Sequence, residues 1–364
     1  MYRLLRPLLF QLDAEQAHGL GMGAVKLGGI APGAVRALYG WRDDRLSQTL
    51  WGLRFHAPLG LAAGFDKNAA GPGLWPALGF GFAEVGSVTA RASSGNPRPR
   101  AFRLPEDRAL INRMGLNNDG AEAVADRLAR ADRPSEFVLA VNVAKTHDPD
   151  ILGDAGIEDF QTSVRHLLPH ADLLVLNVSC PNTAEGKTFE DPAALDALLT
   201  AVMDERARQS SRVPVLVKLS PPASAGLDTG AVDESVAVCL RHGVEGFVAT
   251  NTASDRDGLA TPAKRLAEIG NGGLSGAPLA ARADALVRHL YRRTDGAVPL
   301  IGVGGIDSPE AAYRRIRLGA SLLEVYTGLV YEGPGLVRRI HKGLVRLLDR
   351  DGLGSLTEAV GLDA

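Results

Sequence analysis

The stretch Val-Leu-Val-Lys-Leu at residues 215–219 and the later stretch Ser-Leu-Leu-Glu-Val-Tyr at residues 321–326 show the pattern that decides the fold. Near-continuous apolar runs of this length are typical of strands buried on both faces, as in a parallel sheet. Such runs recur from residue 58 onward, and each ends in polar or glycine-rich residues. The eight predicted strands are Pro58–Ala63, Phe82–Val88, Phe137–Val143, Leu173–Val178, Val215–Leu219, Gly246–Thr250, Pro299–Val303 and Ser321–Tyr326.

Helix-like stretches lie between most of these runs, at Ala121–Ala131, Leu195–Met203, Val232–Leu240 and Leu279–Leu290. Strand followed by helix, repeated eight times, closes most simply into a (β/α)8 TIM barrel of the α/β class. A doubly wound sheet is the alternative, but it would carry Gly-x-Gly-x-x-Gly after an early strand. The stretch at 302–307 lacks the last glycine of that motif, so we expect the barrel.

Length and charge exclude several classes of protein. The chain has 364 residues, 45% of them apolar, and a formal net charge of −2. A near-neutral chain does not have the basic surface from which nucleic-acid binders gain affinity, so no nucleic-acid partner is expected. Two cysteines fit a reducing compartment and cannot form a disulfide scaffold. No apolar run approaches the 18 residues of a spanning helix.

The sequence predicts that the chain divides into three parts. Residues 1–40 form an amphipathic helical extension, with leucines along one side of a first helix and Asp13 capping a second. Such helices either pack as core or contact a bilayer surface. Residues 41–350 form the barrel. Residues 351–364 form a C-terminal tail, whose glycines indicate loose structure. The sequence does not decide the oligomeric state.

Unusual polar residues follow the predicted strands, where a parallel barrel places its chemistry. Lys218 directly follows three apolar residues and should point into the barrel mouth, where a buried ammonium needs a partner. Glycine clusters after the last two strands suit a phosphate bound by backbone N–H groups. Asparagine amides suit the edge of a planar heterocycle. Phosphate, amide edge and buried cation together indicate flavin mononucleotide (FMN), with the redox chemistry performed by the cofactor.

The sequence contains no motif typical of a metal site or of a serine hydrolase. The four-residue spacing of His166 and His170 is broken by Pro169, and no ligand spacing links the two cysteines. No Gly-x-Ser-x-Gly elbow follows a strand. No metal site is therefore predicted.

Seven ordered motifs resemble dihydroorotate dehydrogenase, a flavin enzyme of pyrimidine synthesis. They are Ala-Ala-Gly-Phe-Asp-Lys-Asn (62–68), Gly-Asn-Pro-Arg-Pro-Arg (95–100), Asn-Arg-Met-Gly-Leu-Asn-Asn (112–118), Asn-Val-Ser-Cys-Pro-Asn (177–182), Thr-Asn-Thr (250–252), Gly-Gly-Leu-Ser-Gly (272–276) and Gly-Val-Gly-Gly-Ile (302–306). The segment 10–18 is similar to the class 2 branch, which passes electrons to a quinone. The resemblance implies oxidation of dihydroorotate to orotate, with the N-terminal helices as a membrane-facing lid on the cytoplasmic side of the inner membrane.

The resemblance also implies roles for individual residues. Cys180 would be the catalytic base that removes the C5 proton of dihydroorotate. FMN would be held by Ala63, Gly64, Phe65, Asp66, Lys67, Ser87, Asn142, Asn177, Lys218, Thr250, Gly276, Gly305, Tyr326 and Thr327. Dihydroorotate would be bound by Lys67, Asn112, Arg113, Met114, Gly115, Leu116, Asn177, Asn182, Asn251 and Thr252. The quinone would approach near His18, Arg103 and Tyr326.

Two positions depart from the class 2 pattern. Class 2 members normally carry serine where this chain has Cys180 and phenylalanine where it has Leu116, and both residues here are typical of class 1. A thiolate is an adequate base and forms more easily than an alkoxide. A class 1 acceptor, fumarate or NAD, therefore stays an alternative to quinone.

Two further alternatives remain. One is a related FMN barrel acting on another pyrimidine, such as dihydrouridine in tRNA. The arginine-rich segment 91–113 would be its basic surface, although Glu106 and Asp107 offset it and a partly solvated loop is the simpler interpretation. The other is a barrel that binds flavin or phosphate without catalysis.

Overall fold

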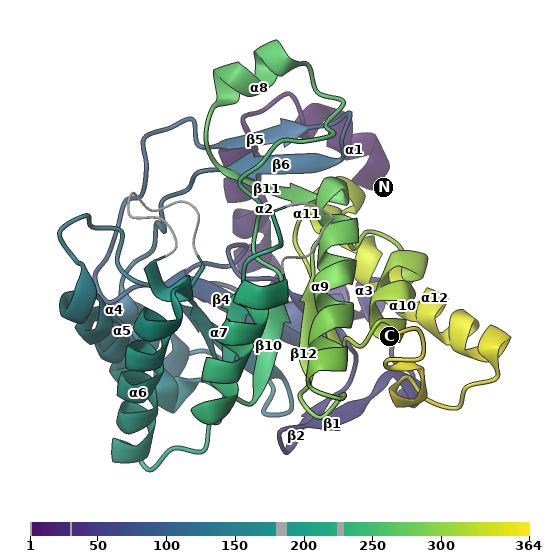
Figure 1. The fold of residues 1–364 in the computed structure, drawn as a ribbon. Helices are drawn as coiled ribbons and strands as arrows, with labels where there is room; N and C mark the ends of the chain where they lie inside the picture. Colours follow the sequence, from purple (N-terminus) through teal and green to yellow (C-terminus); the bar gives the residue numbers. More distant parts are fainter. Residues whose placement is uncertain (1, 30, 180–187, 224–228) are drawn as a thin grey trace.

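The computed structural model describes residues 2–29, 31–179, 188–223 and 229–364. Its centre is a closed barrel of eight parallel strands in the spatial order β10-β12-β13-β3-β4-β7-β8-β9 (Figure 1). All eight predicted strands are confirmed, and the closed barrel excludes the doubly wound sheet. The barrel strands are β3 (Leu59–Leu61), β4 (Phe82–Val88), β7 (Val138–Val143), β8 (Leu173–Asn177), β9 (Val215–Leu219), β10 (Gly246–Ala249), β12 (Leu300–Val303) and β13 (Leu322–Val325).

Helices cover the outside of the barrel and carry the chain back between strands. The four predicted helices are confirmed in α4, α6, α7 and α9. Between β3 and β4 a short 3₁₀ turn, Trp75–Leu78, replaces a helix. The outer helices are α4 (Ala121–Ala129), α5 (Gly153–Leu167), α6 (Pro192–Arg208), α7 (Thr229–Arg241), α9 (Ala280–Arg293), α10 (Pro309–Arg317), α11 (Thr327–Glu332) and α12 (Gly335–Asp351).

Side chains inside the barrel change from apolar to polar along the strands. Because successive strand residues point to opposite faces, residues two apart share the interior. Phe82 is followed two residues later by Glu84, and Leu216 by Lys218. The lower layer is fully apolar and includes Phe55 and Phe82 with rings 5.6 Å apart. The polar layer above it forms the floor of the mouth.

Two small antiparallel sheets close the ends of the barrel, and the sequence reasoning did not anticipate either (Figure 1). The hairpin β1 (Gln48–Leu50) and β2 (Leu53–Phe55) covers the bottom, where Trp51 Nε1 donates to the carbonyl of Glu245 at 2.7 Å. A three-stranded sheet of β5 (Ala101–Leu104), β6 (Ala109–Asn112) and β11 (Gly273–Gly276) stands over the mouth, beside α8 (Ala263–Ile269).

The N-terminal extension folds into three helices, α1 (Tyr2–Leu9), α2 (Ala14–Gly28) and α3 (Pro32–Tyr39). Asp13 caps α2 as predicted, because its carboxylate accepts from the backbone N–H of Glu15 at 2.8 Å. The first helix ends at Leu9, so Leu12, which was expected on its leucine-lined side, lies outside it, and α3 was not predicted. The phenol of Tyr2 donates to the carbonyl of Val330 at 2.5 Å, so α1 rests on α11.

The C-terminal tail is packed against the barrel, so the expectation of loose structure is wrong. Leu356 and Ala359 are fully buried, and the backbone N–H of Leu356 donates to the carbonyl of Arg45 at 2.8 Å. Asp363 pairs with Arg317 at 2.6 Å. The glycines here provide turns around buried side chains.

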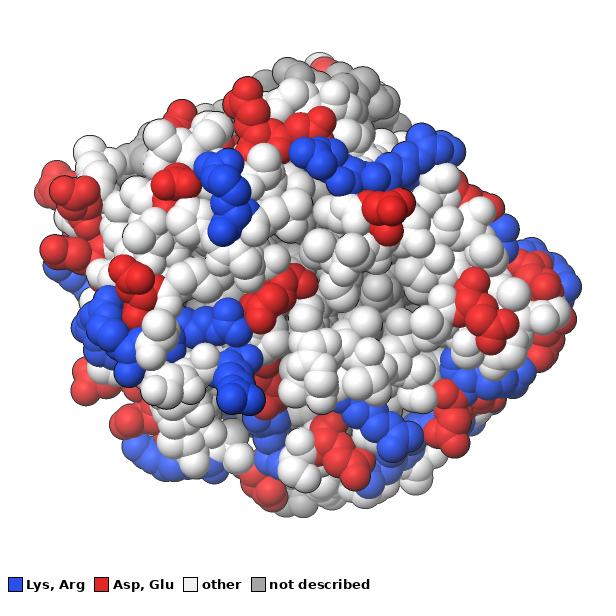
Figure 2. Space-filling view, turned by 60° about the horizontal axis from the view of Figure 1, so that its bottom comes forward, with Lys and Arg blue, Asp and Glu red and all other residues white. Residues whose placement is uncertain are grey.

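Charge is mixed on the face of the molecule seen in Figure 2. Lysines and arginines alternate with aspartates and glutamates around an uncharged, hollowed centre. This pattern agrees with the small net charge. Within the described part of the chain, no helix is both long and apolar enough to cross a bilayer.

Candidate active site

A cavity of about 650 Å³ occupies the mouth of the barrel and continues beneath the N-terminal helices. Its walls come from the carboxyl ends of the barrel strands, from the small upper sheet and from α2. Most of the predicted site residues line it. These are His18, Ala63, Gly64, Phe65, Lys67, Ser87, Arg103, Asn112, Met114, Leu116, Asn177, Lys218, Thr250, Asn251, Thr252, Gly276, Gly305, Tyr326 and Thr327.

The floor of the cavity holds one buried cation between two carboxyl groups. Lys218 Nζ lies 3.3 Å from Glu84 Oε1 and 3.8 Å from Glu324 Oε2, and all three side chains are at most 7% exposed. Burial raises the pKa of Glu324 well above its ordinary value, and the neighbouring Glu84 raises it further. Burial would lower the pKa of Lys218, but the two carboxyl groups outweigh burial and raise it. Lys218 is therefore a permanent positive charge at the floor.

A chain of amides and hydroxyls stands beside this cation. Asn177 donates to the hydroxyl of Ser87 at 3.0 Å and accepts from the side-chain amide of Asn251 at 3.0 Å. Asn251 also accepts from the backbone N–H of Thr252 at 2.9 Å. Strands β4 and β8 and the loop after β10 supply these groups. The network fixes the amide planes, so their donors and acceptors can form hydrogen bonds with the edge of a planar ring.

The loop after β3 places Lys67 on the wall of the cavity. Lys67 Nζ donates to the carbonyl of Gly64 at 2.5 Å. Burial lowers its pKa to about 8, and the Arg100 guanidinium contributes in the same direction. The adjacent Asp66 braces the loop, because its carboxylate accepts from the backbone N–H of Gly71 at 2.9 Å and from Trp75 Nε1 at 3.0 Å.

Glycines on the far wall leave the backbone bare. A Cβ on Gly276 would lie 2.4 Å from the carbonyl oxygen of Arg108, and one on Gly305 would lie 2.4 Å from the Ala280 Cβ. Both residues have positive φ, which glycine adopts at little cost. The hydroxyls of Ser275 and Thr327 lie 2.8 Å apart beside them. The cradle suits a phosphate, which binds to exposed N–H and hydroxyl groups.

The outer end of the cavity is aromatic and largely uncharged. The rings of His18 on α2 and Tyr326 flank Phe65, with centroids 4.9 Å and 5.2 Å from it. Burial and the positive charge on Lys67 together lower the pKa of His18 to about 4, so this imidazole is neutral at neutral pH. Arg103 donates to the carbonyl of Leu9 at 3.0 Å and lies over the ring of Phe10.

Four predicted residues do not line the cavity. Asp66 braces its own loop, and Asn142 is buried in the floor, donating to Glu84 Oε1 at 2.5 Å. Arg113 points outward and lies over the ring of Phe102. Gly115 packs against Asn96. Ligand contacts by these four residues stay predictions, and the side-chain oxygen of Asn142 is buried without a hydrogen-bond partner.

Two predicted residues, Cys180 and Asn182, lie outside the described residues. The structure makes no statement on them.

The sequence reasoning missed four charged residues beside the cavity. Glu84 and Glu324 are inside predicted strands, where alternation with buried apolar neighbours would have shown them facing the interior. Arg100 is 5% exposed and pairs with Glu15, so treating it as part of a solvated loop was wrong. No local signal in the sequence links Glu15 and Arg100, which are 85 residues apart.

No cluster of metal-ligating side chains occurs among the residues with described positions.

Comparison with known proteins was made on sequence and on structure. A family model described as "Dihydroorotate dehydrogenase" matches residues 45–348. A protein of Deinococcus deserti named "Dihydroorotate dehydrogenase (quinone)" is 48% identical and is covered in full, as is this chain. A protein of Nocardia farcinica with the same name is 47% identical over all of this chain and 97% of its own length. The crystal structure of DHODH in complex with ferulenol from Eimeria tenella superposes with a TM-score of 0.85 at 34% identity, covering 96% of each chain.

Proposed function

The chain belongs to the dihydroorotate dehydrogenase family, and we propose that it oxidises dihydroorotate to orotate in pyrimidine biosynthesis, passing the electrons to a quinone. Full-length similarity to relatives named for the quinone-dependent reaction supports this activity. The observation that carries the proposal is a continuous cavity, which joins a polar floor around Lys218 to an apolar end beneath α2.

FMN is the cofactor that this cavity fits. Bare glycine backbone at one wall matches its phosphate, and fixed amides with a buried cation match the polar edge of its ring. When bound, FMN supplies the two-electron chemistry of the reaction. The residues that would hold it are Ala63, Gly64, Ser87, Asn177, Lys218, Thr250, Gly276, Gly305 and Thr327.

The substrate is a pyrimidine ring with a carboxylate, and each part has a matching group. The ammonium of Lys67 would bind the carboxylate, while Asn112, Asn177 and Asn251 would bind the ring amides. Holding the substrate at both ends orients its reacting carbons and lowers the entropic part of the barrier. Thr252 and Leu116 would close the remaining side.

We assign the catalytic base to Cys180 from the sequence motif, and substitution of this residue tests the assignment. Cys180→Ala should slow the reduction of bound flavin by dihydroorotate by about a hundredfold or more, because general bases contribute that much. Cys180→Ser should keep part of the rate. FMN content, read from absorbance, should be unchanged in both variants. Near-normal flavin reduction in the alanine variant would refute the assignment.

Quinone is favoured over fumarate or NAD as acceptor by the lining of the outer end. Leu9, Phe10 and Val35 join His18 and Tyr326 there, and the imidazole of His18 is uncharged at neutral pH. An apolar tunnel suits a neutral lipid-soluble acceptor, whereas fumarate would need paired cations.

Exposed leucines on the outer faces of the N-terminal helices support peripheral contact with the inner membrane. Leucines of α1, α2 and α3 face outward there, and Leu4, Leu8, Leu20, Leu27 and Leu38 are all exposed. Next to α3, the side chains of Arg338, Lys342 and Arg346 on α12 border a shallow pocket with Trp41. An apolar face edged by cations suits an anionic bilayer surface.

Anaerobic mixing with dihydroorotate tests the proposed function. The purified FMN-loaded protein should bleach at the flavin band, and a ubiquinone or menaquinone analogue should restore the colour faster than fumarate or NAD. A protein that stays yellow with dihydroorotate is a flavin-binding barrel of another kind. Faster recovery with fumarate or NAD would overturn the choice of acceptor alone.

A further inference from the structure

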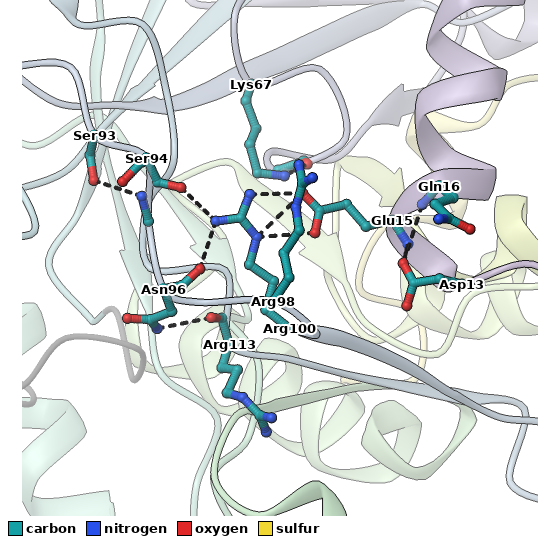
Figure 3. A network of polar contacts seen from close by, with 12 residues as sticks. Asp13, Glu15, Gln16, Lys67, Ser93, Ser94, Asn96, Arg98, Arg100 and Arg113 are labelled. Atoms are coloured by element: carbon teal, nitrogen blue, oxygen red, sulfur yellow. Dashed lines mark hydrogen bonds and ion pairs between the residues drawn. The ribbon is translucent and has the colours of Figure 1, made fainter.

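Glu15, in the first turn of α2, is the centre of an ion-pair cluster that joins the lid to the barrel (Figure 3). Its carboxylate lies 2.7 Å from Arg100 Nη2 and accepts from Arg100 Nε at 3.1 Å. Arg98 Nη2 lies 3.0 Å away. The Arg100 and Glu15 side chains are 6% and 15% exposed, whereas Arg98 is 74% exposed. Solvent therefore screens the charge of Arg98. The buried charge of Arg100 needs a counter-ion within the protein, and Glu15 provides it.

Arg100 is also linked, through Asn96, to the segment that carries predicted substrate residues. Its Nη1 donates to the carbonyls of Ser94 at 2.5 Å and Asn96 at 2.9 Å. Asn96 in turn donates its amide to the carbonyl of Arg113 at 2.9 Å. One guanidinium thus connects α2 with the segment 112–116 (Figure 3).

Lys67 extends toward the same cluster (Figure 3). Three charged groups affect the pKa of Lys67. Arg100 lowers this pKa, whereas Glu15 and Asp66 raise it and so favour the charged ammonium. The carboxylate of Asp66 is already bound to its own loop and to Trp75. His18, the other titratable group of α2 near Lys67, is neutral at neutral pH. Glu15 is therefore the counter-charge that comes from the lid.

We infer that Glu15, by neutralising Arg100, keeps a positive charge on Lys67 for the carboxylate of the substrate, so that the docked helix α2 supports dihydroorotate binding. Glu15 is a positioning residue in this scheme, because it acts through Arg100 and Lys67. The inference rests on the proposed role of Lys67 in binding the carboxylate. It gives the lid a part in substrate affinity as well as in acceptor access.

Removal of the Glu15 charge has a consequence that depends on pH. Without that carboxylate, Arg100 and Lys67 form an uncompensated pair of cations, and Lys67 releases its proton at lower pH. At pH 6 Lys67 stays charged with or without Glu15, so orotate affinity is nearly the same. Above pH 8 the variant has lost most of the charge, so its affinity is lower.

The test is the affinity of oxidised, FMN-loaded protein for orotate between pH 5.5 and 9, measured by calorimetry without quinone. Wild-type affinity should fall above about pH 8. In Glu15→Gln the fall should begin about one pH unit lower, giving about tenfold weaker binding at pH 8.5 and less than twofold at pH 6. Glu15→Asp should restore part of the wild-type profile. Ionisation of orotate itself is common to all variants and cancels in the comparison.

Two controls separate the inference from the proposed function. Asp13→Asn removes one charge from the same end of α2 and keeps the helix cap, so it should follow the wild-type profile. Lys67→Met should abolish orotate binding at every pH. If it does and Glu15→Gln follows wild type, or weakens binding by one factor at all pH values, the inference is overturned while the proposed site stands. If Lys67→Met binds orotate normally, the substrate site and the inference both fall.

Discussion

The ammonium of Lys218 lies between the carboxyl groups of Glu84 and Glu324. One ionised carboxylate would be enough to balance its positive charge. Glu84 lies closer, at 3.3 Å, and its carboxyl group also accepts a hydrogen bond from the side-chain amide of Asn142. Burial and the neighbouring charge of Glu84 keep a proton on Glu324. The raised pKa favours the protonated form of Glu324, so the floor places a carboxylic acid next to the Lys218 charge. Holding that acid protonated at neutral pH costs stability.

The cost predicts that Glu324→Gln stabilises the protein at neutral pH. A carboxyl whose pKa is raised on folding costs nothing below its ordinary pKa of about 4.5. As pH rises from there toward the folded value, stability falls by up to about 1.4 kcal/mol per pH unit. Urea unfolding of the FMN-loaded protein should therefore show Glu324→Gln about 1 kcal/mol or more above wild type at pH 7, and equal to it at pH 4.

The matched control is Glu122→Gln, an exposed position on α4, which should leave the profile unchanged. A Glu324→Gln variant no more stable than wild type at pH 7 would show that Glu324 is ionised in the folded protein.

Single residues differed in how far the sequence could predict them. Lys218 was recognisable because an ammonium directly after three buried residues demands a partner. Alternation along their strands could have shown that Glu84 and Glu324 face the interior. Their pairing with Lys218 could not be predicted, because Glu84 lies 134 residues before it and Glu324 lies 106 residues after it. The pair of Glu15 and Arg100 depends on how α2 docks, which no local pattern encodes.

The N-terminal helices expose a surface that packing in a globular core would have covered. None of the described side chains of α2 or α3 is fully buried, although Met22, Val25 and Val35 pack partly against the core. The outward leucines account for the amphipathic pattern in the sequence. Covering such an apolar face with a bilayer would lower the free energy by about 25 cal/mol for each Å² removed from water.

Charges placed on this face should weaken membrane binding without affecting the flavin site. Leu27→Glu combined with Leu38→Glu should reduce sedimentation with anionic vesicles several-fold, because two carboxylates would enter an apolar, anionic interface. Anaerobic flavin reduction by dihydroorotate should keep its wild-type rate. Leu152→Glu, exposed ahead of α5 on the barrel side, is the control and should sediment as wild type does. Undiminished sedimentation of the double variant would place the membrane contact elsewhere.

Some helices and strands could be predicted from the sequence and others could not. The eight barrel strands are buried on both faces, so each gave a continuous apolar run that the sequence shows directly. Strands β1, β2 and β5 are three or four residues long and partly exposed, so they lack that signal. Strand β6 is buried over only three residues, 109–111, which is too short a run to stand out. The segment that contains β5 and β6 is rich in arginine and was expected to be a loop. Pairing with β11, which lies more than 160 residues later, makes it a sheet.

One cavity connecting a polar floor with an apolar lid is the feature on which the account depends as a whole. The barrel was predictable because its repeat is local and regular, and its mouth is where parallel barrels place their sites. The shape of the cavity was not predictable, because α2, the upper sheet and the loop after β3 meet there from distant parts of the chain. Substrate and acceptor would then use opposite ends of the same space.

A crystal structure with FMN, orotate and a quinone analogue tests this claim most directly. The account predicts the flavin ring over Lys218 and Asn177, orotate beside Lys67 and Asn251, and the analogue between His18 and Tyr326. An analogue bound on the orotate side of the flavin, or a flavin phosphate remote from Gly276 and Gly305, would contradict it.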